Sequence, residues 1–168
     1  MSKVLLLASI FDRRLMVSLF ISLQGSLTCL APGMFLDEDG NEIKDIQGAG
    51  LFVQSRSGEV LRVQMPATAC GFQIGETSQI QSGGLLQATP HAVKSSVGIP
   101  GVTRQSFAVF LEPEFDAPLK IPPGKTLEDC QSSAVQLPPT VRPLKDRWQP
   151  GQTFGDFHTV TVSAFATH

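Results

Sequence analysis

Short segments in which apolar and polar residues alternate recur between residues 50 and 111. A period of two residues is typical of β-strands that bury one face. We expect strands over residues 50–54, 60–65, 69–75, 85–93 and 104–111. The first two flank a turn that ends in Gly58, so they are expected to form a hairpin. The chain is therefore predicted to be mainly β.

The pattern changes after residue 113. Residues 114–152 are rich in proline and polar groups, which predicts loop rather than core. Thr153, with Asp156 three residues later, matches the start of a helix with a capping box. Residues 159–163 alternate in a way that would also suit a strand. The C-terminal element is thus a helix or a strand by this pattern.

Residues 1–24 differ from the rest of the chain. They hold two apolar runs, 4–8 and 15–23, separated by Asp12, Arg13 and Arg14. Neither run reaches the roughly 20 residues that cross a bilayer, so no membrane span is expected. The arginines before the second run also resemble a signal peptide, which would make the protein secreted. We favour instead an alternative start or an inaccurate gene model that replaces a genuine strand, and a packed helix is the third alternative.

Length, charge and cysteines bound the class of protein. The 168 residues are of single-domain size, with 13 Lys and Arg against 15 Asp and Glu and a net charge of −2. No basic run is present, so nucleic-acid binding through phosphates is not expected. The three cysteines, Cys29, Cys70 and Cys130, are odd in number and lack CxxC spacing, which argues against a disulfide framework or a zinc knuckle. We expect a cytoplasmic protein.

Candidate chemistry lies on the last two predicted strands. Arg104 and Ser106 are two residues apart, so on a strand they share a face about 6.6 Å apart. A guanidinium fork with a hydroxyl beside it is a good receptor for a carboxylate. His91 ends the preceding strand, where a lone histidine is more often structural than a metal ligand. By themselves these residues are weak indications of an anion site and of a metal site, because an exposed arginine on an edge strand is usually only solvated.

Several motifs occur in the order found in one enzyme family. They are Gly-Phe-Gln-Ile-Gly-Glu at 71–76, Gly-Gly at 83–84, Thr-Pro-His-Ala-Val at 89–93 and Arg-Gln-Ser followed by Phe-Ala-Val-Phe-Leu-Glu-Pro at 104–113. Residues 25–168 resemble the C-terminal half of the catalytic domain of Fe(II)/2-oxoglutarate dioxygenases, in the branch that includes isopenicillin N synthase. The resemblance implies a partial double-stranded β-helix, or jelly roll, with short helices. It also favours a C-terminal helix, with His158 on its surface.

The resemblance also implies roles for the site residues. His91 would be one ligand of Fe(II), and Arg104 with Ser106 would bind the distal carboxylate of 2-oxoglutarate, while the family oxidises a small organic substrate. The family's other two iron ligands form a His-x-Asp just before a Gly-x-Leu-Thr segment, which residues 25–28 match. Residues 21–24 are Ile-Ser-Leu-Gln and hold no such pair.

We therefore expect a chain that is truncated relative to the family, is inactive as written and has no assignable catalytic residue. The alternative is a non-catalytic β-domain that binds carboxylates or another protein. The open sheet edges of a partial barrel are also expected to promote self-association.

Overall fold

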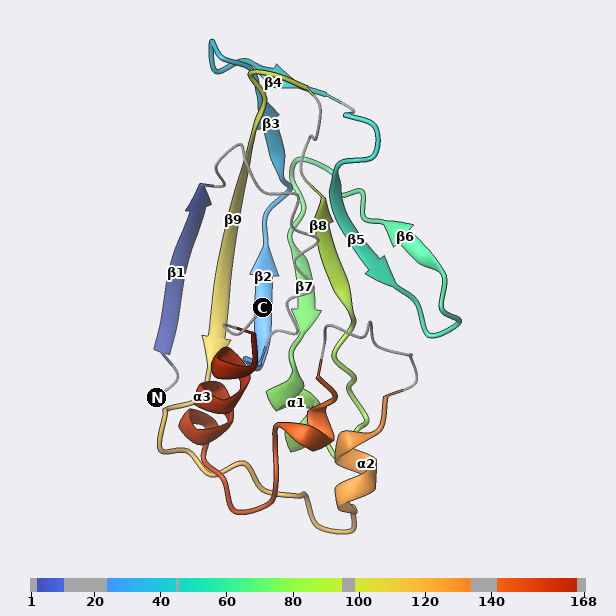
Figure 1. The fold of residues 1–168 in the computed structure, drawn as a ribbon, viewed down its shortest axis with the longest axis vertical. Helices are drawn as coiled ribbons and strands as arrows, with labels where there is room; N and C mark the ends of the chain where they lie inside the picture. The colour runs from blue at the N-terminus through green and yellow to red at the C-terminus, as the bar shows by residue number, and fades with distance from the viewer. Residues whose placement is uncertain (1–2, 11–23, 45, 95–98, 134–141, 166–168) are drawn as a thin grey trace.

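The computed structural model describes residues 3–10, 24–44, 46–94, 99–133 and 142–165, which form two β-sheets with helices gathered at one end (Figure 1). The strands are β1 (Lys3–Ile10), β2 (Leu27–Leu30), β3 (Met34–Leu36), β4 (Glu42–Ile43), β5 (Gly50–Gln54), β6 (Val60–Arg62), β7 (Gly71–Ile74), β8 (His91–Lys94) and β9 (Thr103–Glu112). The helices are α1 (Glu76–Gln81), α2 (Leu127–Gln131), the 3-10 turn η1 (Leu144–Asp146) and α3 (Phe154–Phe165). No helix among these described residues is long and apolar enough to cross a membrane.

The larger sheet is antiparallel and centres on β9. Its order is β4-β3-β9-β2-β7, and β1 also pairs with β9. Leu111 of β9 pairs with Leu27 of β2 and with Val4 of β1, so these two strands lie on opposite sides of β9. The helix considered for the N-terminal segment is therefore wrong for Lys3–Ile10. The second apolar run and Arg13-Arg14 lie outside the described residues.

The smaller sheet has the order β6-β5-β8. The predicted hairpin is confirmed, because Phe52 of β5 pairs with Arg62 of β6 and the turn closes with a bond from Ser55 N–H to the Glu59 carbonyl. β8 pairs with β5 and places His91 opposite Val53. β8 is thus an edge strand of this sheet among the residues described.

The strand expected over residues 85–93 is too long, because β8 begins only at His91. The backbone before it is held by side chains of the α1 region instead of a strand ladder. The N–H of Leu86 donates to Oγ of Ser82, and the N–H of Ala88 donates to Oε1 of Gln79, both at 3.0 Å. In a strand, these two backbone N–H groups would donate to the adjacent strand instead, so the segment does not join the sheet.

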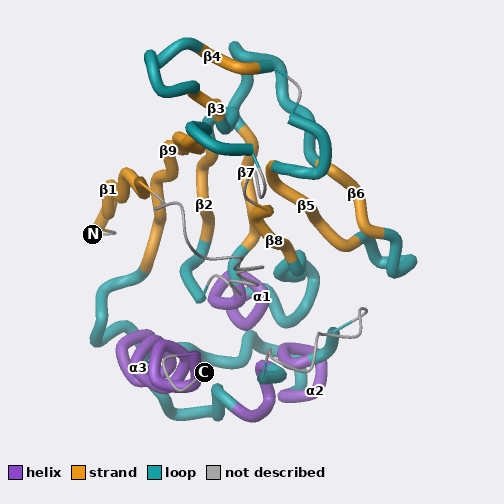
Figure 2. Tube along the Cα trace, turned by 45° about the horizontal axis from the view of Figure 1, so that its top comes forward, coloured by secondary structure: helices purple, strands orange, loops and turns teal. Residues whose placement is uncertain are grey.

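The described part of residues 114–152 is largely loop, as predicted, but the expectation that it contributes no core is wrong. This stretch contains α2 and η1, and it supplies most of a buried apolar cluster beneath the sheets, at the end where the helices lie (Figure 2). The buried members of the cluster are Ile80, Leu119, Cys130, Leu144, Trp148, Phe154 and Phe157. A second, smaller cluster comprises Phe35, Ile46, Ala49 and Val102.

The C-terminal helix is confirmed as α3, and its start has the predicted capping contacts. The Thr153 N–H donates to the Asp156 carboxylate at 2.9 Å, and the Asp156 N–H donates to Thr153 Oγ1 at 3.2 Å. His158 is not a surface residue as predicted. It is half-buried, with its ring 5.3 Å from that of Phe115 and its Nδ1 3.3 Å from Nε2 of Gln24.

A buried ion pair joins the helices to one another. Arg147, which follows η1, donates from Nη1 to Oε2 of Glu76 at 2.7 Å and from its second terminal nitrogen to the other carboxylate oxygen. Nη1 also donates to Oγ1 of Thr161 in α3 at 3.1 Å. All three residues are buried, so α1, η1 and α3 share one polar contact inside the apolar cluster.

Candidate functional site

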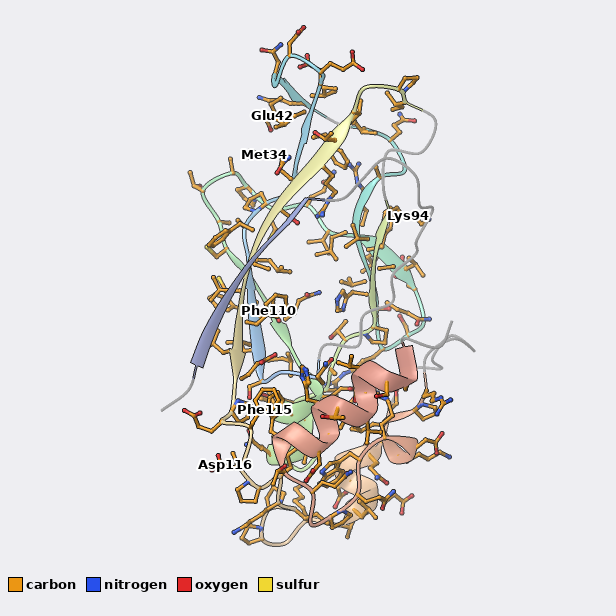
Figure 3. All side chains as sticks on the ribbon, turned by 60° about the vertical axis from the view of Figure 1, so that its left-hand side comes forward. Met34, Glu42, Lys94, Phe110, Phe115 and Asp116 are labelled. Atoms are coloured by element: carbon orange, nitrogen blue, oxygen red, sulfur yellow. The ribbon has the colours of Figure 1, made fainter. Side chains whose placement is uncertain are left out.

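The long strand β9 positions Arg104 and Ser106. Alternate residues of a strand share a face, so these two side chains lie on the same face as Phe110. Figure 3 shows Phe110 in the space between the two sheets. Arg104 and Ser106 are both half-buried and face this interior, while Phe107, on the other face, is 45% exposed.

The guanidinium of Arg104 places a positive charge in this interior, and one of its N–H donors has no partner among the described residues. Its Nε is buried and has no hydrogen-bond partner among the described residues. Burial of the guanidinium lowers the pKa of Arg104 from its ordinary value. A buried donor without a partner typically costs about 1–3 kcal/mol, and more when it is charged. An anion that accepted from this group would remove that cost.

Gly33 makes room for the guanidinium. A Cβ atom at position 33 would lie 2.7 Å from Nη2 of Arg104, closer than carbon and nitrogen can pack. β3 pairs with β9 through Met34 and Gln105, and Gly33 immediately precedes Met34. The guanidinium therefore lies against Gly33, on the interior face that Ser106 shares.

Gln73 adds a second donor that was not predicted from the sequence. It lies on β7 opposite Thr28, and Thr28 lies opposite Phe110, so all three face the interior. Nε2 of Gln73 is buried and has no hydrogen-bond partner in the part of the chain that the structure describes. The signal in the sequence was a single amide between Phe72 and Ile74 in an otherwise apolar strand.

His91 lies on the smaller sheet. Lys94, three residues later on β8, is exposed and points its Nζ over the ring of Phe52 at 4.7 Å, so alternation places His91 on the other face. Nδ1 lies 3.1 Å from the carbonyl of Thr89, and a protonated Nδ1 would donate to it and leave Nε2 as the free lone pair. Burial lowers the pKa of His91, which favours the neutral ring that binds metals, although the bond to Thr89 acts in the opposite direction.

The described residues fit a carboxylate better than they fit iron. A facial iron site needs two histidines and a carboxylate, whereas the described part of the chain has no cluster of three or more His, Cys, Asp or Glu side chains. Gln24, the last of the four residues that stand where the ligand pair is expected, contacts His158. Positions 21 and 23 are Ile and Leu and lie outside the described residues. For a carboxylate, by contrast, Arg104 offers a buried Nε–H that has no partner among the described residues, and Gly33 offers the space.

Comparison with solved structures identifies the fold. A full-length Neurospora crassa protein in complex with alpha-KG and thymine matches with a TM-score of 0.52 and 18% identity over 88% of this chain and 36% of that chain. A putative 2OG-Fe(II) oxygenase family protein from Caulobacter crescentus matches with a TM-score of 0.51 and 22% identity, over 84% of this chain and 38% of that chain. JOX2 in complex with 2OG, Fe and JA matches with a TM-score of 0.52 and 23% identity, over 88% of this chain and 36% of that chain. No protein-family model and no curated protein sequence matches the chain.

At these identities the likeness establishes the fold. The chain has the mainly β fold of the 2OG-Fe(II) oxygenases and spans little more than a third of the length of the proteins it matches. The expected class, a partial double-stranded β-helix, is confirmed.

Proposed function

We propose that this chain binds the distal carboxylate of 2-oxoglutarate, or of a similar dicarboxylate, between its two sheets. The observation that carries the proposal is the buried Nε of Arg104, which has no partner among the described residues and whose guanidinium lies against Gly33. The guanidinium would donate two parallel charge-assisted bonds to the carboxylate, and the Ser106 hydroxyl would donate a third. Neighbours of the same fold bind alpha-KG or 2OG, which supports the same ligand class here.

Gln73 fits this ligand as a further contact from the neighbouring part of the sheet. Its unpartnered amide N–H faces the same interior as Arg104, and an oxygen acceptor on the ligand would satisfy it. Two orphaned donors on one interior face favour an acceptor-rich ligand over an apolar one, because each unpaired buried donor carries a desolvation cost.

Binding of the carboxylate does not by itself give the iron-dependent oxygenase reaction. Fe(II), when bound in this fold, would supply the site at which oxygen is activated, and His91 offers one imidazole for it. The residues that precede Gly25, where the family carries its His-x-Asp, are Ile21, Ser22, Leu23 and Gln24. This donor set does not fit a facial triad. We therefore propose that the chain by itself binds the carboxylate without turning it over.

Isothermal titration with 2-oxoglutarate tests the binding site. Arg104→Lys should lower the affinity about tenfold to a hundredfold, since removing a charge-assisted partner costs roughly 1.5–3 kcal/mol and an ammonium cannot reproduce the fork. Arg56→Lys, in the exposed turn between β5 and β6, is the matched control and should bind like the wild type. Equal affinity in the wild type and Arg104→Lys would contradict the proposal.

A turnover assay tests the second part. The purified chain with Fe(II), oxygen and 2-oxoglutarate should form no succinate above a metal-free control. Iron-dependent succinate that disappears in His91→Ala would show instead that the chain assembles a working iron site.

A further inference from the structure

Two cysteines far apart in the sequence meet on the outer face of the larger sheet. Cys29 of β2 pairs with Phe72 of β7, and Cys70 precedes Phe72 by two residues, so the two thiols extend from the same face. This face is opposite to that of Thr28, which is 2% exposed and faces the interior with Phe110. Phe72, between the two cysteines, is 64% exposed. The pair is therefore accessible from solvent and separate from the carboxylate site.

The two thiols are neighbours, one on β2 and one just before β7, and are not joined to each other. The side chain of Cys70 lies near enough to act on the Cys29 thiol, and neither cysteine is in a disulfide. Loss of solvent, with a smaller contribution from Cys70, raises the pKa of the Cys29 thiol. Cys70 is exposed, whereas Cys29 is half-buried. Cys70 is thus the thiol that a dissolved oxidant reaches first.

The backbone at Cys70 can adjust to bond formation. Diagonal neighbours on adjacent strands have their Cβ atoms farther apart than directly opposed pairs, and a disulfide needs a Cβ–Cβ distance of about 3.5–4.5 Å. Cys70 lies just before β7 and just after a turn closed by the bond from the Ala69 N–H to the Pro66 carbonyl. Because it is not part of the β7 ladder, it can move toward Cys29 without breaking strand pairing.

We propose that Cys29 and Cys70 form a redox-active pair that closes reversibly into an intramolecular disulfide when a disulfide oxidant such as oxidised glutathione is present. The Cys70 thiolate attacks oxidised glutathione and forms a mixed disulfide, which releases one glutathione thiolate. The Cys29 thiolate then attacks the Cys70 sulfur and releases the second glutathione. Two protein thiols lose two electrons and two protons, and one oxidised glutathione becomes two reduced molecules.

The third cysteine is excluded from this chemistry. Cys130 is fully buried in the apolar cluster, with its Sγ donating to the Ile80 carbonyl at 3.5 Å. It therefore serves as an internal control, because it should stay reduced while the other two cysteines react.

The test is a glutathione redox titration of the full chain. After quenching with an alkylating agent, mass spectrometry should show loss of two alkylatable thiols, a peptide linking Cys29 to Cys70, and full recovery of both thiols on reduction. Cys130→Ser should behave like the wild type. Cys70→Ser should lose the link. A glutathione adduct that persists on Cys70 while Cys29 stays alkylatable, or a link between two chains, would overturn the proposal.

A second measurement tests whether the two reduced thiols lie close together, without any oxidation step. Phenylarsine oxide bridges two thiols that lie close together, so it should bind the reduced wild type and Cys130→Ser in a one-to-one ratio. The affinity should fall at least tenfold in both Cys29→Ser and Cys70→Ser. Unchanged binding in either of these single variants would show that the two thiols do not act as a pair.

Discussion

Gly33 and Arg104 are complementary in shape: the guanidinium occupies the space that a side chain at position 33 would fill. The nearest approach of a Cβ built on Gly33 is 2.7 Å, to Nη2 of Arg104. The arginine is anchored on β9 and the glycine precedes β3, so pairing of these two strands sets where the cation lies. The position of the proposed carboxylate site thus depends on a residue that would never contact the ligand's charge.

Gly33→Ala should therefore weaken ligand binding without unfolding the protein. The added methyl group meets only the end of a flexible side chain, so the guanidinium moves and the backbone can stay. We expect the affinity for 2-oxoglutarate to fall about tenfold, roughly one charge-assisted bond, in a calorimetric titration. Met34→Ala, at the neighbouring and 46% exposed position, is the control and should bind normally. Normal binding by Gly33→Ala would mean that the guanidinium need not lie where the structure has it.

The ion pair between Glu76 and Arg147 should be important for stability. Glu76→Gln would remove the carboxylate that pairs with the buried guanidinium of Arg147, and breaking such a pair typically costs about 3–5 kcal/mol. Urea unfolding should show this loss as a lower transition midpoint. Glu59→Gln, at an exposed turn, should change the free energy of unfolding by less than about 0.5 kcal/mol. Similar midpoints for the two variants would show that solvent reaches Arg147.

Acid should destabilise the fold through His91. Burial lowers the folded-state pKa of His91 below its ordinary value of 6.5, so the unfolded chain binds the proton more readily. The stability that the neutral ring contributes is complete above pH 6.5 and is lost as the pH falls through the lower, folded-state pKa. Urea unfolding at about pH 7.5 and about pH 5.5, on either side of the ordinary pKa, should show a larger loss in the wild type than in His91→Gln.

His158→Gln is the matched control for this pH effect. It leaves His91 in place and should keep the full acid-induced loss. If His91→Gln lost as much stability on acidification as the wild type, other groups would account for the effect.

The parts of the fold that the sequence predicted are those where local pattern and tertiary structure agree. The β5–β6 hairpin is marked by the turn between two apolar segments, β9 is a run of strand-forming residues, and the capping residues Thr153 and Asp156 act within four residues of chain. Helix α1 was missed because its six residues, Glu-Thr-Ser-Gln-Ile-Gln, show no apolar period. It is stabilised by distant groups, as when Nε2 of Gln79 donates to the Cys130 carbonyl at 3.0 Å.

The core of the 114–152 region could not be predicted for a related reason. Its buried residues, such as Leu119, Leu144 and Trp148, are widely spaced among prolines and follow neither the helical nor the strand period. In the candidate site, Arg104 and Ser106 were predicted from the family resemblance, and strand alternation places them on one face. Gln73 and Gly33 were not predicted as site residues. Their positions near the site depend on which strands pair, and contacts across the sheet determine that pairing.

The open edges of the sheets should promote self-association. β7 pairs only with β2, and β8 only with β5, among the described strands, and Phe72 on β7 is 64% exposed. The wild type should form concentration-dependent oligomers in sedimentation velocity, and Phe72→Lys should shift them toward monomer. Leu85→Lys removes a similar apolar residue, 72% exposed but outside the strands, and should not. A wild type that stays monomeric at every concentration would contradict this prediction.

The Nε–H resonance of Arg104 in a two-dimensional ¹H–¹⁵N spectrum, assigned by its absence in Arg104→Lys, tests the proposed carboxylate site most directly. This group is buried and has no partner in the described structure, so it should gain one only when a carboxylate binds. Titration with 2-oxoglutarate should move the resonance downfield, saturably, at the affinity measured by calorimetry. A resonance that stays in place while 2-oxoglutarate saturates the protein would show that the carboxylate binds elsewhere.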